Sequence, residues 1–162
     1  MKSRILIAAG TFLALAGCMQ SVPVTQPPVN VAVKASSADR QIFGFTEPTV
    51  RSFVKEGNTR KEVAGARCTL ASAEFRTSLI TPAIVRMPIV KGRPTSMRIS
   101  CDAGSMKGAK QFNPSLQGTM VTGTGTAGLV ATVVSTAIVA GRDRWSYGTN
   151  GSVISVDLKT AE

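Results

Sequence analysis

Apolar and polar residues alternate most regularly over residues 64–104. Met97, Ile99 and Cys101 alternate with polar neighbours, which is the period of two expected of a strand with one buried face. Pro, Gly or Ser, as at Thr81-Pro82, separate four short segments of this kind: AGARCTLA, EFRTSLI, AIVRMPIV and PTSMRISC. The pattern predicts a mainly β fold, a small antiparallel sheet or sandwich, in which Met97, Ile99 and Cys101 face inward.

Residues 39–63 have a less regular pattern. They contain enough apolar side chains to pack against the rest of the domain. Thr49 to Glu56 predict two helical turns, which Gly57 or Asn58 would end.

Residues 19–38 are rich in proline and small polar residues and show no helical periodicity. This composition predicts an extended tether, and twenty such residues would reach roughly 60 Å. The valines of this segment alternate in part, so the alternative is that some of it adds to the sheet as an edge strand.

The first residues have the pattern of a targeting signal. Lys2 and Arg4 precede the apolar run Ile5–Leu15, which is too short for a bilayer span of about 20 residues and matches the apolar region of a secretory signal. Leu15-Ala16-Gly17-Cys18 resembles the lipobox of bacterial lipoproteins, in which the cysteine is acylated and becomes the first residue after cleavage. A plain secretory signal is the alternative.

The lipobox resemblance implies a cellular address. Met19 follows Cys18 where an aspartate would mark retention at the inner membrane of enterobacteria. The resemblance therefore implies an outer-membrane protein that faces the periplasm, with the inner membrane as the alternative. Two or three acyl chains anchor a protein stably, so Cys18 would provide the membrane attachment by itself.

Two of the three cysteines then remain to be assigned. The periplasm is oxidising, so Cys68 and Cys101 predict a disulfide. In the chain-entropy model a loop of this length stabilises the fold by roughly 3.8 kcal/mol. The alternatives are metal ligation and a redox pair, but the chain has no Cys-x-x-Cys motif and no histidine to complete such a site.

Residues 118–141 form a Gly-rich apolar segment within a long stretch that has no charge. Small residues recur every fourth position from Gly123 to Ser135, a spacing that lets helices approach closely. Three interpretations compete: a transmembrane helix over 120–141, a buried helix or hairpin in the domain, and a surface for self-association or membrane contact over 123–141. We favour the buried segment. A G-x-G-x-x-G match at 123–128 lies in a β pattern rather than a βαβ unit, so no cofactor is predicted.

Composition excludes several kinds of chemistry. The chain has no histidine, which excludes a Ser-His-Asp triad, a Cys-His pair and a His-ligated zinc ion. The nine acidic residues are scattered singly, so we predict no catalytic residues, no metal site and no enzymatic activity.

The charge points to an anionic partner. Loss of residues 1–17 removes Lys2 and Arg4 and lowers the formal net charge from +10 to +8. Secretion takes the chain away from nucleic acid, so the expected partners are anionic envelope components such as lipopolysaccharide and peptidoglycan. Arg142, Arg144 and Trp145 predict a contact for phosphate or carboxylate, made by a guanidinium fork and an aromatic wall. A solvated turn before the last strand is the alternative.

Three short motifs carry a further resemblance: Cys68-Thr69-Leu70, Thr81-Pro82-Ala83-Ile84-Val85, and MRISCDAG over residues 97–104. Over residues 64–158 the chain resembles poorly characterised bacterial lipoproteins with a PEGA-like β-domain. The resemblance implies counterparts at 118–141, at Trp145-Ser146-Tyr147 and at 152–158. It implies a β fold and an envelope address, but no established activity.

These observations divide the chain into three parts. We expect a lipoprotein signal peptide over 1–17, a lipidated cysteine and flexible tether over 18–38, and a periplasmic β-rich domain over 39–162. The expected role is a structural or interaction module of the cell envelope. The alternatives are a membrane-active or self-associating protein that uses the Gly-rich segment, and a periplasmic ligand-binding protein.

Overall fold

The computed structural model describes residues 21–117 and 143–160, and the predicted mainly β fold is confirmed. Cys18, the Gly-rich segment and Arg142 lie outside the described residues. Within these described ranges one short helix occurs, η1, which spans Ala35–Ser37. The strands are β1 (Val29–Asn30), β2 (Ala32–Val33), β3 (Ile42–Thr46), β4 (Thr49–Glu56), β5 (Thr59–Val63), β6 (Arg67–Ala71), β7 (Phe75–Ile80), β8 (Ala83–Lys91), β9 (Met97–Ala103), β10 (Met106–Phe112), β11 (Ser115–Leu116), β12 (Arg144–Ser146) and β13 (Val153–Thr160).

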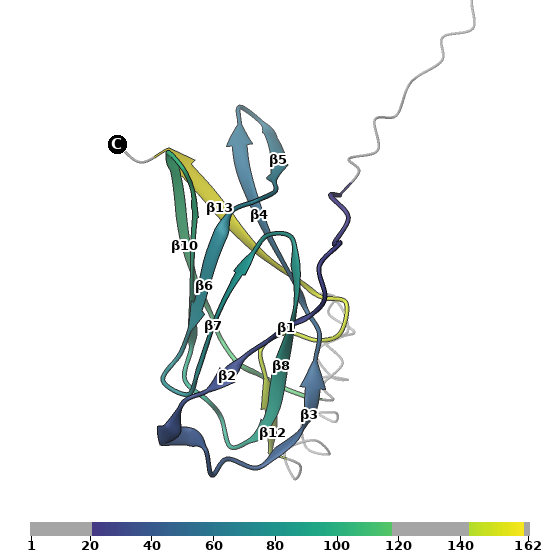
Figure 1. Cartoon of the computed structure of the whole chain (residues 1–162), viewed down its shortest axis with the longest axis vertical. Coiled ribbons are helices and arrows are strands. Elements are labelled where there is room, and N and C mark those ends of the chain that lie inside the picture. The colour runs from purple at the N-terminus through teal and green to yellow at the C-terminus, as the bar shows by residue number, and fades with distance from the viewer. Residues whose placement is uncertain (1–20, 118–142, 161–162) are drawn as a thin grey trace, which may run out of the picture.

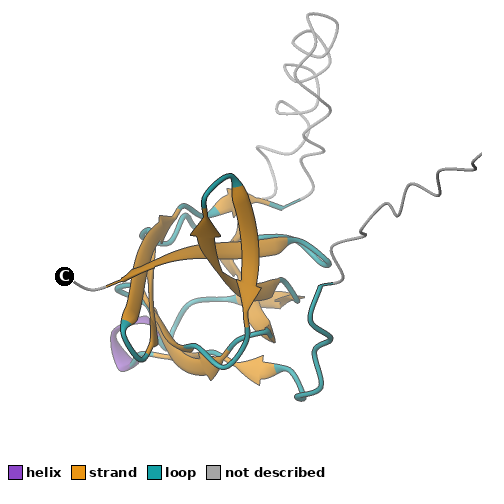
Figure 2. Cartoon of the chain, turned by 90° about the horizontal axis from the view of Figure 1, so that it is seen from above, coloured by secondary structure: helices purple, strands orange, loops and turns teal. Residues whose placement is uncertain are grey.

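The strands form a closed ring (Figures 1 and 2). Hydrogen-bonded neighbours follow the order β8, β4, β13, β10, β9, β6 and β7. The N-terminal strands complete the circuit, since β2 pairs with β7 and β1 pairs with β8. Two of the pairings, β1 with β8 and β4 with β13, are parallel. The sheet is therefore mixed rather than purely antiparallel, because the C-terminal strand inserts between β4 and β10.

The segment predicted as a flexible tether contributes to this ring. Val29–Asn30 form β1 and Ala32–Val33 form β2, so here the structure has the alternative in which part of the segment adds to the sheet. Hydrogen bonds to β7 and β8 hold these strands in the sheet, although their composition predicts an extended tether.

The helical prediction for Thr49–Glu56 is wrong, because these residues form β4. Val50 and Ser52 are buried while their neighbours are not, which is a period of two. β4 also pairs with β5, β8 and β13, and these sheet hydrogen bonds replace those of a helix. Gly57 begins the two-residue turn to β5 with a φ of 60°, a left-handed conformation that glycine adopts without strain.

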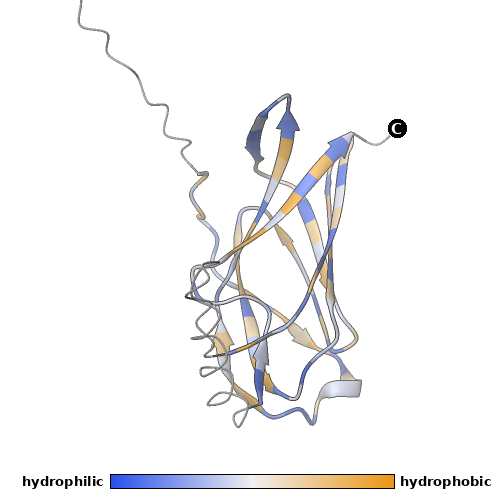
Figure 3. Cartoon of the chain, turned by 180° about the vertical axis from the view of Figure 1, so that it is seen from behind, coloured by the Kyte–Doolittle hydropathy of each residue, from blue (hydrophilic) through white to orange (hydrophobic). Residues whose placement is uncertain are grey.

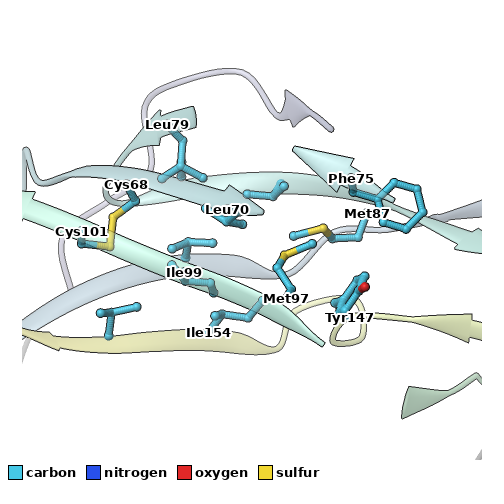
Figure 4. Packing of buried hydrophobic residues seen from close by; sticks show 14 of the residues in the cluster. Cys68, Leu70, Phe75, Leu79, Met87, Met97, Ile99, Cys101, Tyr147 and Ile154 are labelled. Carbon is cyan, nitrogen blue, oxygen red and sulfur yellow. A yellow bond between two sulfur atoms is a disulfide. The ribbon is translucent and has the colours of Figure 1, made fainter. Parts of the chain in front are cut away.

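The core fills the inside of the ring. Hydrophobic and hydrophilic positions alternate along the strands (Figure 3), which directs one face of each strand inward. The predicted inward residues Met97, Ile99 and Cys101 are buried, as expected. At one end of the core Phe75 and Tyr147 meet edge to face, with ring centroids 6.2 Å apart (Figure 4).

The predicted disulfide is confirmed. Cys68 of β6 and Cys101 of β9 are direct cross-strand partners with their Cα atoms 4.0 Å apart. The bond lies at the end of the core opposite Phe75 and Tyr147 (Figure 4). Only 2% and 3% of the two cysteines is exposed, so a reductant reaches the bond when the domain opens.

Gly108 of β10 lies close against the backbone of β13. A Cβ atom at this position would lie 2.2 Å from the carbonyl oxygen of Asp157 in β13. No side-chain rotation relieves a contact with backbone, so any larger residue would push β10 away from β13.

We predict that Gly108→Ala lowers the free energy of unfolding by about 2 kcal/mol or more, as overpacking against backbone does. Urea unfolding measures this change. Ala109→Ser, at the next and exposed position, is the control and is expected to change stability by less than about 0.5 kcal/mol. Equal stability of Gly108→Ala and the unsubstituted chain would contradict the packing of β10 against β13.

Candidate functional site

Two of the three residues predicted to contact an anion are described, and both lie in β12. The third, Arg142, is outside the described residues. β12 pairs with β8 on one side and with β11 on the other. Arg144 and Trp145 are therefore held by strand hydrogen bonds and do not lie in a solvated turn.

Arg144 lies directly opposite another cation. Its cross-strand partner in β8 is Lys91. Like charges at directly opposite positions destabilise a sheet. Among the described residues, no carboxylate lies within ion-pair distance of Arg144 or Lys91. The pair therefore concentrates positive charge that the described part of the protein does not neutralise.

Aromatic rings lie beside three arginines of this region. The Arg144 guanidinium lies 4.5 Å from the centre of the Phe43 ring, and the Arg93 guanidinium lies 5.3 Å from that of Trp145. A third contact of this kind joins Arg86 and Phe45 at 4.7 Å. We call these residues the basic–aromatic patch: Phe43, Phe45, Arg86, Lys91, Arg93, Arg144 and Trp145.

A bulge in β3 provides one of the aromatic rings. Ile42 pairs with Val90 and Gly44 with Ile89, so Phe43 is an extra residue opposite β8. Bulges of this kind redirect a side chain, here one that stays 36% exposed beside Arg144. A buried hydrogen bond of 2.9 Å between the hydroxyls of Thr46 and Ser146 links β3 to β12 below the patch.

The acidic groups near the patch already have partners. The Trp145 indole N–H donates to the Asp143 carboxylate at 2.9 Å. Glu47 lies 3.3 Å from the Nε atom of Arg86. Lys91, Arg93 and Arg144 thus remain as the cations of the patch that have no carboxylate partner in the described chain. The sequence motif indicated Arg144 and Trp145, whereas no local signal indicated Phe43, Lys91 or Arg93.

The chain also contains a buried carboxylate, Glu74, in the turn between β6 and β7. It accepts hydrogen bonds from the Thr95 N–H at 3.0 Å, the Thr95 hydroxyl at 2.8 Å and the Ser72 hydroxyl at 3.1 Å. Arg40 lies 3.5 Å away. Burial alone would raise the pKa of Glu74, but these hydrogen bonds together lower it below its ordinary value. Glu74 is therefore an ionised group that holds the Arg40 and Thr95 segments together, and it is poorly suited to act as a base.

Tyr147 lies beside Glu74 and closes this end of the core. Its hydroxyl donates a hydrogen bond to the carbonyl oxygen of Thr95, and the residue is 1% exposed. Burial raises the pKa of Tyr147 to about 12, and the Glu74 carboxylate adds to the shift.

Nowhere in 21–117 or 143–160 do three His, Cys, Asp or Glu side chains come together in a way that could hold a metal ion. In the same ranges no helix has the length and apolar character needed to cross a membrane.

Comparisons with protein-family models, with curated proteins and with solved structures found no match to this chain. The resemblance of residues 64–158 to lipoproteins with a PEGA-like β-domain therefore stays a prediction.

We predict that Tyr147 titrates at a pH of about 12 in the folded protein and at about 10 in denaturant. The chain has one tyrosine, so its near-ultraviolet absorbance reports this group alone. The folded state binds the phenol proton more tightly, so this contribution to stability is complete below pH about 10 and is lost as the pH rises through about 12. Titration of the folded protein near pH 10 would contradict the burial of Tyr147.

Proposed function

We propose that this chain is a cell-envelope lipoprotein, anchored through Cys18 at the outer membrane and facing the periplasm. Its disulfide-linked domain would be an interaction module without enzymatic activity that binds an anionic envelope component through the basic–aromatic patch. The observation that supports this proposal is the direct pairing of Arg144 with Lys91, beside aromatic rings and without a carboxylate partner among the described residues.

The chemistry of the patch favours a phosphate or carboxylate ligand. Such a group placed between Arg144 and Lys91 would relieve their mutual repulsion and receive charge-assisted hydrogen bonds from both. Phe43, whose ring lies 4.5 Å from the Arg144 guanidinium, would limit the access of water to it and so strengthen the interaction. Lipopolysaccharide has phosphate groups and peptidoglycan has carboxylates, so both are candidate partners.

The second candidate function is self-association or membrane contact through residues 123–141. The observation that favours it is the pairing of β11 with β12, in which Leu116 is opposite Trp145. The strand before residues 118–141 and the strand after them are thus paired with each other. The chain therefore leaves the described domain and returns to it beside the basic–aromatic patch. A ligand-binding role for the domain is the remaining alternative.

We expect Arg144→Gln and Lys91→Gln each to weaken the binding of an anionic envelope ligand about tenfold, since each removes one charge-assisted contact. Trp145 is the only tryptophan, so its fluorescence follows binding when lipopolysaccharide or a soluble peptidoglycan fragment is added to the full chain carrying Cys18→Ser. Arg98→Gln is the matched control, because Arg98 is an exposed arginine of β9 in the opposite wall. An equal loss of affinity in Arg98→Gln would refute the assignment of the patch.

We expect the lipid anchor to depend on one residue. Cells that express the full chain should incorporate labelled palmitate into it, and Cys18→Ser should abolish this labelling. Cys68→Ser is the control for the loss of a cysteine and should keep the label. Unchanged labelling of Cys18→Ser would exclude a lipid at this position.

A further inference from the structure

The geometry points to a second functional surface, at the end of the ring opposite the basic–aromatic patch. We propose that this end rests on the anionic lipid headgroups of the membrane in which Cys18 is anchored, an inference that depends on the proposed anchor. The surface, which we call the cationic end, comprises Lys55, Arg60 and Lys61 of the β4–β5 hairpin, Lys107 of β10 and Lys159 of β13. Figure 1 shows the hairpin and the ends of β10 and β13 together at one end of the long axis, with β3 and β12 at the other.

The start of the described chain is held beside the hairpin. The Val22 N–H donates to the Glu62 carboxylate at 3.0 Å, and the Val22 carbonyl accepts a hydrogen bond of 2.8 Å from Arg51. Arg51 of β4 and Glu62 of β5 are themselves joined at 2.6 Å, and their side chains are only 14% and 9% exposed. This largely buried ion pair therefore binds both polar groups of the Val22 backbone.

The position of Val22 limits the distance between the domain and the membrane. Three residues lie between Cys18 and Val22, and the four residue-to-residue steps, at about 3.5 Å each, extend at most roughly 14 Å. A tether that was free as far as residue 38 would have reached roughly 60 Å. While Val22 keeps its contacts, an acylated Cys18 places the headgroups next to the β4–β5 hairpin.

The hairpin and its neighbouring strands carry cationic side chains, which an anionic lipid surface attracts. Lys55 lies directly opposite Arg60, and Lys107 lies directly opposite Lys159. Arg60 and Lys107 have carboxylate partners, Asp157 at 2.7 Å and Asp102 at 3.5 Å, respectively. The three remaining lysines are exposed and have no carboxylate within ion-pair distance in the part of the chain that the structure describes: Lys55, Lys61 and Lys159.

The surface is also hollowed where these cations meet. A depression of about 320 Å³ lies between the hairpin and β13, and Lys55, Arg60 and Lys159 are among the residues that line it. A lipid phosphate in this depression would lie between Lys55 of the hairpin and Lys159 of β13, beside the ion pair of Arg60 with Asp157. Anionic headgroups thus complement the cationic end in charge, and the short link to Cys18 brings them within reach.

The first test measures attraction to lipid without the anchor. The full chain carrying Cys18→Ser is sedimented with vesicles of phosphatidylglycerol and phosphatidylcholine, or of phosphatidylcholine alone. We expect binding to the anionic vesicles only, weakened by salt and reduced about tenfold by Lys55→Glu with Lys61→Glu. The matched control is Arg76→Glu with Arg98→Glu, which makes the same change in charge on β7 and β9. An equal reduction in both double variants, or no reduction in either, would overturn the assignment.

The second test measures the orientation of the lipidated full chain on vesicles whose headgroups carry a nitroxide quencher. A fluorophore at position 58, introduced by Asn58→Cys, reports the hairpin, and Trp145 reports the opposite end. We expect quenching at position 58 and little at Trp145. The reverse pattern on a chain with an acylated Cys18, verified by mass spectrometry, would overturn this inference but leave the anchor intact. A chain that lacks the acyl group in cells would overturn both.

Discussion

β8 holds the domain together, because four other strands form hydrogen bonds with it. Its first half pairs with β4 on one edge and with β1 on the other, and its second half pairs with β3 and β12. Its inward side chains Val85, Met87 and Val90 have no exposed surface. Through these contacts β8 closes the ring with β1, contributes to the core and holds the strands that form the basic–aromatic patch. A change that shifts β8 would alter all three at once.

The sequence predicts the strands correctly where the alternating apolar residues are also the ones that the structure buries. Met97, Ile99 and Cys101 alternate with polar residues, and the structure buries all three. The disulfide was predictable because Cys68 and Cys101 are an even pair once Cys18 is assigned elsewhere. The prediction for Thr49–Glu56 was wrong because β4 pairs with β8 and β13, which are distant in sequence, in addition to the adjacent β5, and a local window does not detect the distant partners. The same holds for residues 29–33, whose partners in β7 and β8 lie more than forty residues away.

The candidate site likewise contains some residues that the sequence indicated and others that it did not. Arg144 and Trp145 stand in one short cationic and aromatic motif, so their chemistry was visible in the sequence. Lys91, Arg93 and Phe43 belong to distant segments and meet them only through the pairing of β8 with β3 and β12. The isolated motif also suggested a turn, whereas pairing with β8 and β11 places these residues on a strand. Whether two cations lie opposite each other depends on the register between two strands. The sequence did not indicate the register of β8 with β12.

The place of β13 has a consequence for the order in which the domain can form. This last strand lies between β4 and β10, so the ring stays open until the C-terminal residues have left the membrane channel in a chain exported from its N-terminus. Cys68 and Cys101 precede β13 and lie on neighbouring strands, so they can be oxidised while the ring is still open. The Cys68–Cys101 disulfide would then hold β6 and β9 in register before β13 is added to the sheet.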